Sequence, residues 1–122
     1  MAELGSHQDE RGLIEDLLSG PIDCVTRIST RKNAVRGNHV HAATTQWAYI
    51  ISGRLLVITE KDGFRQRRVY DPGEIAEELP GTAHAWRALE DTVCLVFTRG
   101  PRSGASYEDD VERLTEKAKL IR

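Results

Sequence analysis

Short turn sequences recur about every ten residues through the middle of this chain. They are Ser52-Gly53, Asp62-Gly63, Asp71-Pro72-Gly73, Pro80-Gly81 and Glu90-Asp91. Gly, Asp and Pro favour turns because they adopt or preset the backbone angles that turns require. Between the turns, apolar and polar residues alternate as they do along a strand. Short strands at this spacing predict an all-β sandwich or barrel.

Eight segments fit antiparallel strands and suit a closed jelly roll. They are residues 22–29, 38–42, 45–52, 54–60, 64–70, 74–78, 83–89 and 92–99. The clearest hairpin is at Asp62-Gly63, because a type I′ turn needs positive φ at both central residues. We therefore place a β-barrel over residues 21–100.

The two ends of the chain follow other patterns. Within residues 1–20, the spacing of Leu13, Ile14, Leu17 and Leu18 predicts a short helix that acts as a strap and ends at Gly20-Pro21. Within residues 101–122, the apolar residues Tyr107, Val111, Leu114 and Ala118 fit a helix capped by Ser106. An extended tail that packs across a dimer interface is the alternative for this second segment.

Length and charge narrow the function classes. A chain of 122 residues forms one domain with one core and room for one pocket. Its 17 Lys and Arg residues against 19 Asp and Glu residues argue against nucleic acid as the main partner, since such binding relies on a basic surface. No Gly-rich phosphate loop opens a predicted helix, so the sequence gives no sign of dinucleotide chemistry.

The cysteines and the hydropathy of the sequence indicate the cellular compartment in which we expect the protein. Cys24 and Cys94 lie in apolar alternating runs, so we interpret them as small buried side chains rather than as a disulfide. The sequence shows no signal peptide and no apolar run near the roughly 20 residues that a membrane span needs. We expect a cytoplasmic protein with no membrane partner.

Three of the four histidines fall at related strand positions. His39 and His41 are two residues apart in one predicted strand, so their side chains share a face. His84 lies in a separate strand after the Pro80-Gly81 turn, and Gln46 adds an amide oxygen. Imidazoles on one face can share a divalent metal ion, so the pattern predicts a site built from these four residues.

The same residues resemble the first motif of the cupin superfamily. That motif reads Gly, His-x-His, three or four residues, Glu, six residues and Gly. Here Gly37 precedes His39-Val40-His41, Gln46 follows after four residues, and Gly53 ends the pattern. Only the Glu is replaced.

The second cupin motif is matched at Gly73, Pro80-Gly81 and His84, whereas Leu79 and Ala88 depart from it. The resemblance covers about residues 36–88. It implies the cupin fold, a double-stranded β-helix that forms a jelly-roll barrel.

The string Arg36-Gly37-Asn38-His39-Val40-His41 is similar to the Arg-Gly-x-His-x-His string of cupins that act on nucleotide sugars, such as dTDP-sugar ketoisomerases and capsular polysaccharide enzymes. In those ketoisomerases two histidines act as acid and base without a metal. This resemblance implies that His39 and His41 move protons at a keto sugar and that Arg36 helps to bind it.

Gln46 leaves the metal question open. In metal cupins the Glu supplies a charged oxygen beside three imidazoles, and a neutral amide is a weaker ligand. A divalent ion (Fe, Mn, Ni, Cu or Zn) can be held by His39, His41 and His84, with or without Gln46 as a further ligand. If Gln46 is not a ligand, its carbonyl oxygen can accept a hydrogen bond from an imidazole N–H and orient that ring. The alternatives are a metal-free proton-transfer site and a purely structural cluster.

Strand alternation suggests further pocket residues. Trp86 shares a face with His84, where it would either pack in the core or offer a flat surface to a sugar, a nucleobase or an aromatic substrate. Arg68 could reach an anion in the pocket, and Tyr107 and Arg102 are candidate lid residues. Trp47, Tyr49 and Ile51 point outward if Gln46 points inward, and a homodimer would cover them.

We expect a small metal-binding cupin that acts as an enzyme on a small polar substrate. Isomerisation or epimerisation of a carbohydrate or nucleotide sugar is the favoured reaction. The alternatives are an iron-dependent oxygenase and a non-catalytic sugar or metabolite sensor. The sensor is supported by the loss of the motif Glu and by the lack of an obvious carboxylate base beside the histidines.

Overall fold

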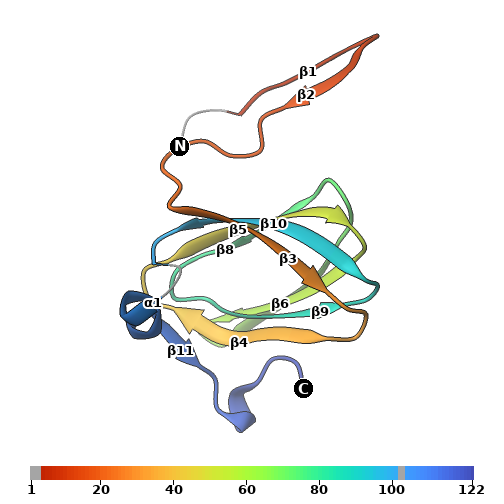
Figure 1. Ribbon diagram of the computed structural model, residues 1–122. Helices are drawn as coiled ribbons and strands as arrows, with labels where there is room; N and C mark the ends of the chain where they lie inside the picture. The colour runs from red at the N-terminus through yellow and green to blue at the C-terminus, as the bar shows by residue number, and fades with distance from the viewer. Residues whose placement is uncertain (1–3, 102–103) are drawn as a thin grey trace.

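The computed structural model describes residues 4–101 and 104–122. Two antiparallel sheets face each other around the core (Figure 1). The first, in the order β3-β10-β5-β8, consists of β3 (Cys24–Thr30), β5 (Thr45–Ser52), β8 (Ile75–Glu78) and β10 (Thr92–Arg99). The second, in the order β11-β4-β9-β6-β7, consists of β4 (Val35–His41), β6 (Leu55–Lys61), β7 (Phe64–Tyr70), β9 (Ala83–Ala88) and β11 (Val111–Arg113). The all-β jelly roll predicted from the sequence is confirmed.

The predicted strand ranges are close to the observed ones. Residues 45–52, 64–70 and 92–99 coincide with β5, β7 and β10. The largest error is at β4, which begins at Val35 rather than at residue 38. Gly37 and Asn38 have φ values of 88° and 56°, and the β4–β9 register shifts there. The strand therefore continues through a bulge that turn-like residues conceal in the sequence.

The main core lies between the two sheets. Ala48 and Ile50 of β5, Leu55 and Val57 of β6, and Trp86 of β9 belong to one buried cluster. Complete burial of a side chain such as Ile50 contributes roughly 1.5–3 kcal/mol. The alternation that places Ala48 and Ile50 in this core also places Gln46 on the inner face, as predicted.

Trp47 points outward, as predicted, but it is not exposed. Its Nε1 donates a hydrogen bond of 2.9 Å to Oε2 of Glu77, and the guanidinium of Arg99 lies 5.0 Å from the ring centroid. Only 5% of Trp47 is exposed. The chain therefore covers this ring itself and does not need a second copy to do so.

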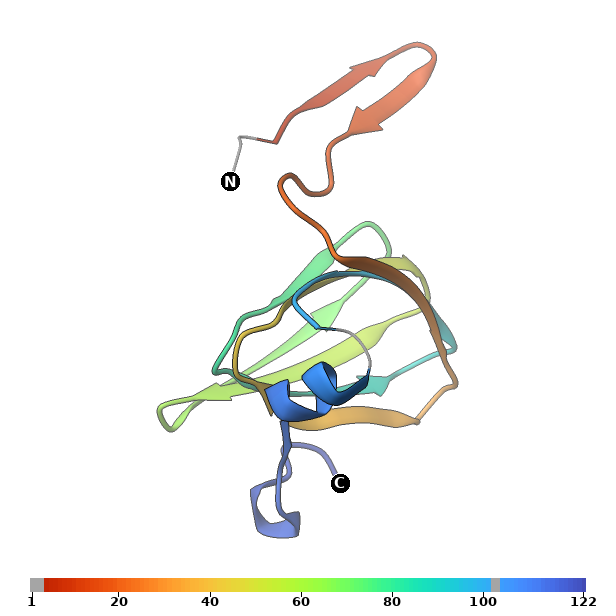
Figure 2. The same cartoon turned by 60° about the vertical axis from the view of Figure 1, so that its left-hand side comes forward.

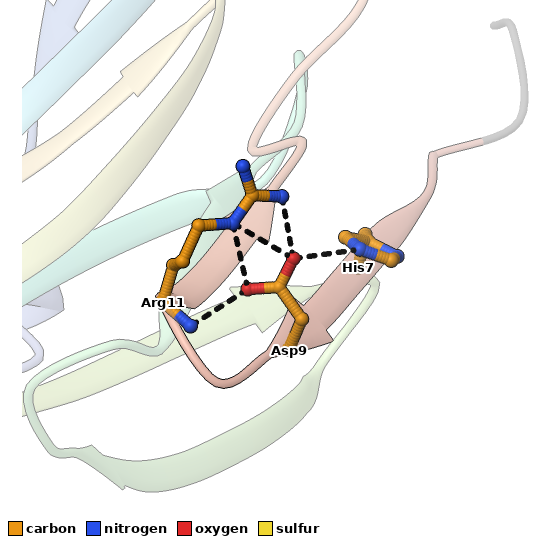
Figure 3. Close-up of polar contacts among 3 residues, drawn as sticks. All are labelled: His7, Asp9 and Arg11. Carbon is orange, nitrogen blue, oxygen red and sulfur yellow. Dashed lines mark hydrogen bonds and ion pairs between the residues drawn. The ribbon is translucent and has the colours of Figure 1, made fainter.

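The N-terminal segment is a β-hairpin, so the predicted helix is wrong. β1 (Ser6–Asp9) pairs with β2 (Gly12–Glu15), and both strands stand clear of the barrel (Figures 1 and 2). The carboxylate of Asp9 accepts hydrogen bonds from the backbone N–H and the guanidinium of Arg11 and lies 3.3 Å from Nε2 of His7 (Figure 3). This turn chemistry overrides the helical spacing of Leu13 and Ile14.

The C-terminal segment is neither one helix nor a fully extended tail. α1 (Gly104–Asp110) ends where β11 begins, and a 3-10 turn, η1 (Glu116–Ala118), follows. Ser106 lies inside α1 and does not cap it. β11 pairs with β4, and Leu120 and Ile121 pack against Leu56 and Ile58 on the outer face of the second sheet.

Both cysteines are free thiols, with Cys94 buried and Cys24 partly buried, in line with the sequence interpretation. Among the described residues, no helix is both long and apolar enough to span a membrane.

Candidate active site

Three histidines meet on the inner face of the second sheet. His39 and His41 lie on β4, and His39 is the register partner of His84 on β9. The centroid of the His39 ring lies 4.8 Å from that of His41 and 4.6 Å from that of His84. One ligand nitrogen from each of the three residues lies within 4.8 Å of the other two. The structure therefore brings together the three histidines that the sequence singled out.

Gly37 allows β4 and β9 to approach each other beside this cluster. A Cβ at position 37 would lie 2.9 Å from the carbonyl oxygen of His84, and the φ of Gly37 is positive. A larger residue would push the strands apart and separate His39 from His84.

A cavity of about 210 Å³ opens in front of the histidines. Its walls combine imidazoles, other polar groups and aromatic or aliphatic side chains. They comprise Ile28, Arg36, Gly37, His39, His41, Gln46, Glu78, His84, Trp86 and Tyr107. This volume suits part of a small polar ligand, such as one sugar ring.

His41 is held by a buried carboxylate. Its Nδ1 lies 3.2 Å from Oδ2 of Asp110, the last residue of α1. The hydroxyl of Thr44 donates to the same oxygen at 2.5 Å, and the backbone N–H of Ala43 donates to Oδ1 at 2.7 Å. Burial alone would raise the pKa of Asp110, but these hydrogen bonds hold it below its usual value, so the carboxylate is ionised.

The opposite nitrogen of His41 has no such partner. Nε2 is buried and has no hydrogen bond within the described part of the chain. Since Asp110 fixes the ring orientation through Nδ1, Nε2 is left available for a ligand, a proton or a metal ion.

A second buried carboxyl group, Glu78, lies beside His84. Oε2 of Glu78 is 3.0 Å from Nε2 of His84, without hydrogen-bond alignment, and Oε1 accepts a short hydrogen bond from Nε1 of Trp86. Burial raises the pKa of Glu78 to about 8, although the Trp86 bond opposes the change. Glu78 therefore holds a proton at neutral pH.

Burial has the reverse effect on two of the imidazoles. It lowers the pKa of His84 to about 3, helped by the nearby His39 and His41. It lowers the pKa of His39 to about 4, helped by His41 and Arg113. Both rings are neutral at physiological pH, the form that ligates metals and that donates a hydrogen bond from one ring nitrogen.

The other predicted site residues fall into two groups. Gln46, Arg36, Trp86 and Tyr107 line the cavity. Gln46 donates a weak hydrogen bond of 3.5 Å to Thr98, and no hydrogen bond joins it to an imidazole in the described residues. Arg36 lines the cavity although its guanidinium also bonds Thr30 and the carbonyl of Ser29.

The prediction that Arg68 reaches the pocket is wrong. Its guanidinium pairs with Glu74 at 2.9 Å and lies 4.4 Å from the ring centroid of Tyr70, in a separate hollow along β7. β7 is the edge strand of its sheet, on the far side of β9 and β6 from the histidines of β4. Arg102 lies outside the described residues.

Sequence reasoning missed both carboxylates. Glu78 carried a signal, because it lies two residues after the buried Ala76 in β8 and alternation places both on the inner face. Asp110 carried none, because it is 69 residues from His41 and precedes a strand that was not predicted. The expectation that no carboxylate base lies beside the histidines is corrected.

Comparison with known proteins identifies the family and the fold of the chain. Residues 18–103 match the model of the family described as Cupin. A dTDP-4-dehydrorhamnose 3,5-epimerase from Sulfolobus tokodaii has a similar structure, with a TM-score of 0.72 and 16% identity over 93% of this chain and 74% of that one. No curated protein sequence matches the chain.

Two further solved structures are similar. A sugar 3,4-ketoisomerase from Thermoanaerobacterium thermosaccharolyticum in complex with TDP gives a TM-score of 0.75 and 15% identity over 94% of this chain and 87% of that one. The capsular polysaccharide assembling protein of Staphylococcus aureus gives a TM-score of 0.65 and 17% identity over 93% of this chain but only 32% of that one. At these identities the likeness shows a shared fold.

Proposed function

The chain belongs to the cupin family, and from this we propose that it isomerises or epimerises a keto sugar carried by a nucleoside diphosphate. The observation that carries the proposal is the His41–Asp110 pair at the cavity wall, with Nε2 of His41 buried and unpartnered. Two similar structures are complexes of a 3,4-ketoisomerase with TDP and with TDP-4-keto-6-deoxyglucose, which suggests the substrate class.

The proposed chemistry needs only proton transfers. Nε2 of His41 removes a proton from the carbon next to the carbonyl, and the ionised Asp110 stabilises the imidazolium that forms. The electron pair moves onto the carbonyl oxygen and gives an enolate, which is an enediolate where the deprotonated carbon carries a hydroxyl group. In isomerisation, the proton of that hydroxyl passes to the former carbonyl oxygen, and the imidazolium of His41 returns its proton to the former carbonyl carbon. In epimerisation, a second donor delivers a proton to the opposite face of the same carbon, and His41 releases its own proton to solvent. No oxidant or reductant is required.

Other cavity residues would support this step. His39 is neutral, so one ring N–H can donate a hydrogen bond to the carbonyl oxygen as negative charge develops there. The ring centroid of Tyr107 lies 5.8 Å from that of His41, which places a phenol at the same wall. Trp86 offers an apolar face and Arg36 a cation for binding the substrate.

The test uses TDP-4-keto-6-deoxyglucose in D₂O, followed by NMR. Deuterium should enter the sugar at the carbon next to the carbonyl, and His41→Asn should abolish this exchange while the protein stays folded. Addition of a chelator should leave the rate unchanged. If the wild type binds TDP but exchanges no proton from this sugar, the enzyme proposal fails and the sensor alternative takes its place.

A metal centre is the second candidate, favoured by the close approach of His39, His41 and His84. The donors fit: three neutral imidazoles suit a divalent ion, and Asp110 and Glu78 each lie against one ring nitrogen, as the outer partners of metal-bound histidines do. Bonds of about 2.0–2.1 Å would require the rings to move inward slightly. A bound ion would polarise a carbonyl oxygen.

Elemental analysis decides this second candidate. Protein grown with Fe, Zn, Ni and Mn should carry one equivalent of metal, and the His39→Ala, His41→Ala double variant should carry none. Equal metal content in both proteins would contradict a site at these histidines.

We also propose a homodimer joined through the N-terminal hairpin. A free two-stranded hairpin is marginally stable in water, and Leu13 and Ile14 are 59% and 69% exposed. Light scattering should give twice the chain mass, and Leu13→Ser, Ile14→Ser should reduce it to the chain mass. A monomeric wild type would contradict the proposal.

A further inference from the structure

The outer face of the second sheet carries a basic hollow, distinct from the histidine cavity. Its floor is apolar and is formed by Leu56 and Ile58 of β6 with Leu120 and Ile121. Its rim is cationic and consists of Arg65, Arg67, Arg87, Lys117, Lys119 and Arg122. Among the described residues, no acidic side chain lines it.

The strand register explains why these cations gather. In β6, Leu56 is paired with Arg87 of β9, and Ile58 is paired with Arg67 of β7. Side chains of directly paired residues share a face, so Arg67 and Arg87 flank the apolar floor on the side opposite the main core. Leu55 and Val57, which alternate with Leu56 and Ile58 along β6, face that core.

The C-terminal segment supplies the second half of the rim. It passes along the outer side of the second sheet, away from the first sheet (Figures 1 and 2). Asn38 fixes it there, since its side chain accepts from the N–H groups of Leu120 and Ile121 and donates to the carbonyl of Ile121 at 2.7 Å. Lys117 and Lys119 are thereby brought to the same hollow as the β-sheet arginines.

Internal ion pairs leave much of this charge uncompensated. Arg65 pairs with Glu60, and Lys119 pairs with Glu116, which is also 3.8 Å from Arg122. Arg87 donates to the backbone carbonyl of Arg122. Arg67 and Lys117 have no ionic partner within the described ranges. Two side-chain carboxylates, those of Glu60 and Glu116, thus pair with a rim that holds six Lys and Arg side chains, in a chain whose formal net charge is −2.

From this arrangement we infer that the hollow binds a small oligophosphate, such as the di- or triphosphate group of a nucleotide. Arginine and lysine side chains from β7, β9 and the C-terminal segment can match several phosphate oxygens, and the Leu-Ile floor can carry an apolar or aromatic body. Six of the 17 Lys and Arg residues gather at this one hollow, while acidic residues outnumber basic ones over the rest of the chain, which favours a small anion over a nucleic acid. This site lies behind the sheet that carries His39 and His84 and does not depend on the proposed function.

Calorimetry with sodium tripolyphosphate and the full chain at low salt tests the inference. The wild type should bind one equivalent, and Arg67→Ala, Arg87→Ala should weaken binding by about tenfold or more, since charge-assisted hydrogen bonds are lost. Arg27→Ala, Arg31→Ala is the matched control, because it removes the same charge from the other sheet and a loop and should change binding by less than about twofold. Because Arg67 is exposed, the single variant Arg67→Gln should fold normally, and it should also weaken binding of tripolyphosphate.

Three outcomes would overturn the inference. The first is that the wild type shows no saturable binding of tripolyphosphate. The second is that the Arg27→Ala, Arg31→Ala control loses as much affinity as the Arg67→Ala, Arg87→Ala variant. The third is that a His39→Ala, His41→Ala variant loses affinity for tripolyphosphate while the Arg67 variants do not. Binding of a single-stranded oligonucleotide that tripolyphosphate does not displace would point to nucleic acid instead and would also contradict it.

Discussion

Nδ1 of His41 and Oδ2 of Asp110 lie 3.2 Å apart and join the barrel wall to the end of α1, across 69 residues of sequence. Both side chains are almost fully buried, with exposed fractions of 3% and 6%. The pair therefore links the orientation of the imidazole that we propose as the base to the folding of the C-terminal segment.

Replacement of Asp110 by Asn should slow proton exchange in the keto sugar by about 100-fold or more, because the imidazolium at His41 loses its counter-ion. The affinity for TDP should change little. Deuterium incorporation measured by NMR gives the rate. Asp109→Asn is the control, since Asp109 is exposed and one residue away, and its rate should match the wild type. Equal rates in both variants would remove Asp110 from the mechanism.

Replacement of Glu78 by Gln should change how stability depends on pH in metal-free buffer. The folded protein keeps the Glu78 proton up to a pKa of about 8, whereas the unfolded chain loses it near its ordinary value of 4.5. Glu78 therefore lowers the stability of the wild type increasingly as pH rises from about 4.5 to 8.

Urea unfolding at pH 5 and pH 8 measures this effect. The free energy of unfolding of Glu78→Gln, taken relative to that of the wild type, should be higher at pH 8 than at pH 5 by an amount on the order of a few kcal/mol. Glu90→Gln, at an exposed carboxylate, should show no such increase. A constant difference between the Glu78 variant and the wild type would mean that the carboxyl is ionised throughout.

Replacement of Gly53 by Ala should destabilise the fold by about 3 kcal/mol or more. A Cβ there would lie 2.3 Å from the carbonyl oxygen of Asp91, and the φ of Gly53 is +93°. Gly63→Ala provides the comparison, because Gly63 also has a positive φ but has open space around it. It should cost only the backbone strain of about 1–2 kcal/mol. Thermal unfolding should show a larger loss of stability for Gly53→Ala than for Gly63→Ala. Equal losses of stability would mean that the backbone around Asp91 shifts and removes the contact with the new Cβ.

Replacement of Asn38 by Ala should release the C-terminal segment and cost about 1–3 kcal/mol. The amide protons of Leu120 and Ile121 should then exchange faster, because both donate to the Asn38 side chain. Asn33→Ala is the control, since Asn33 also has a positive φ but does not hold this segment. Unchanged exchange at Leu120 and Ile121 in the Asn38 variant would mean that packing against Leu56 and Ile58 suffices.

The barrel could be predicted from the sequence because its signals are local. Asp62-Gly63 specifies a turn, and alternation around Gln46 specifies which face enters the core. The histidine cluster could also be predicted, since His39 and His41 share a face by spacing alone.

The predictions that were wrong or incomplete share one physical cause, which is that the structure there depends on contacts between residues that local spacing does not encode. Leu13 and Ile14 have helical spacing, but the Asp9–Arg11 turn and strand pairing decide their structure. Arg68 lies on the inner face by alternation, but its distance from the histidines depends on the order of strands in the sheet, which spacing does not encode. Asp110 reaches His41 only through long-range packing.

The part of the chain that matches the family ends at residue 103, just before the helix that carries Tyr107 and Asp110. A fragment cut there would retain every histidine of the cluster and lose the carboxylate that aligns one of them. The match to the family and the proposed His41–Asp110 pair are thus encoded by different lengths of sequence.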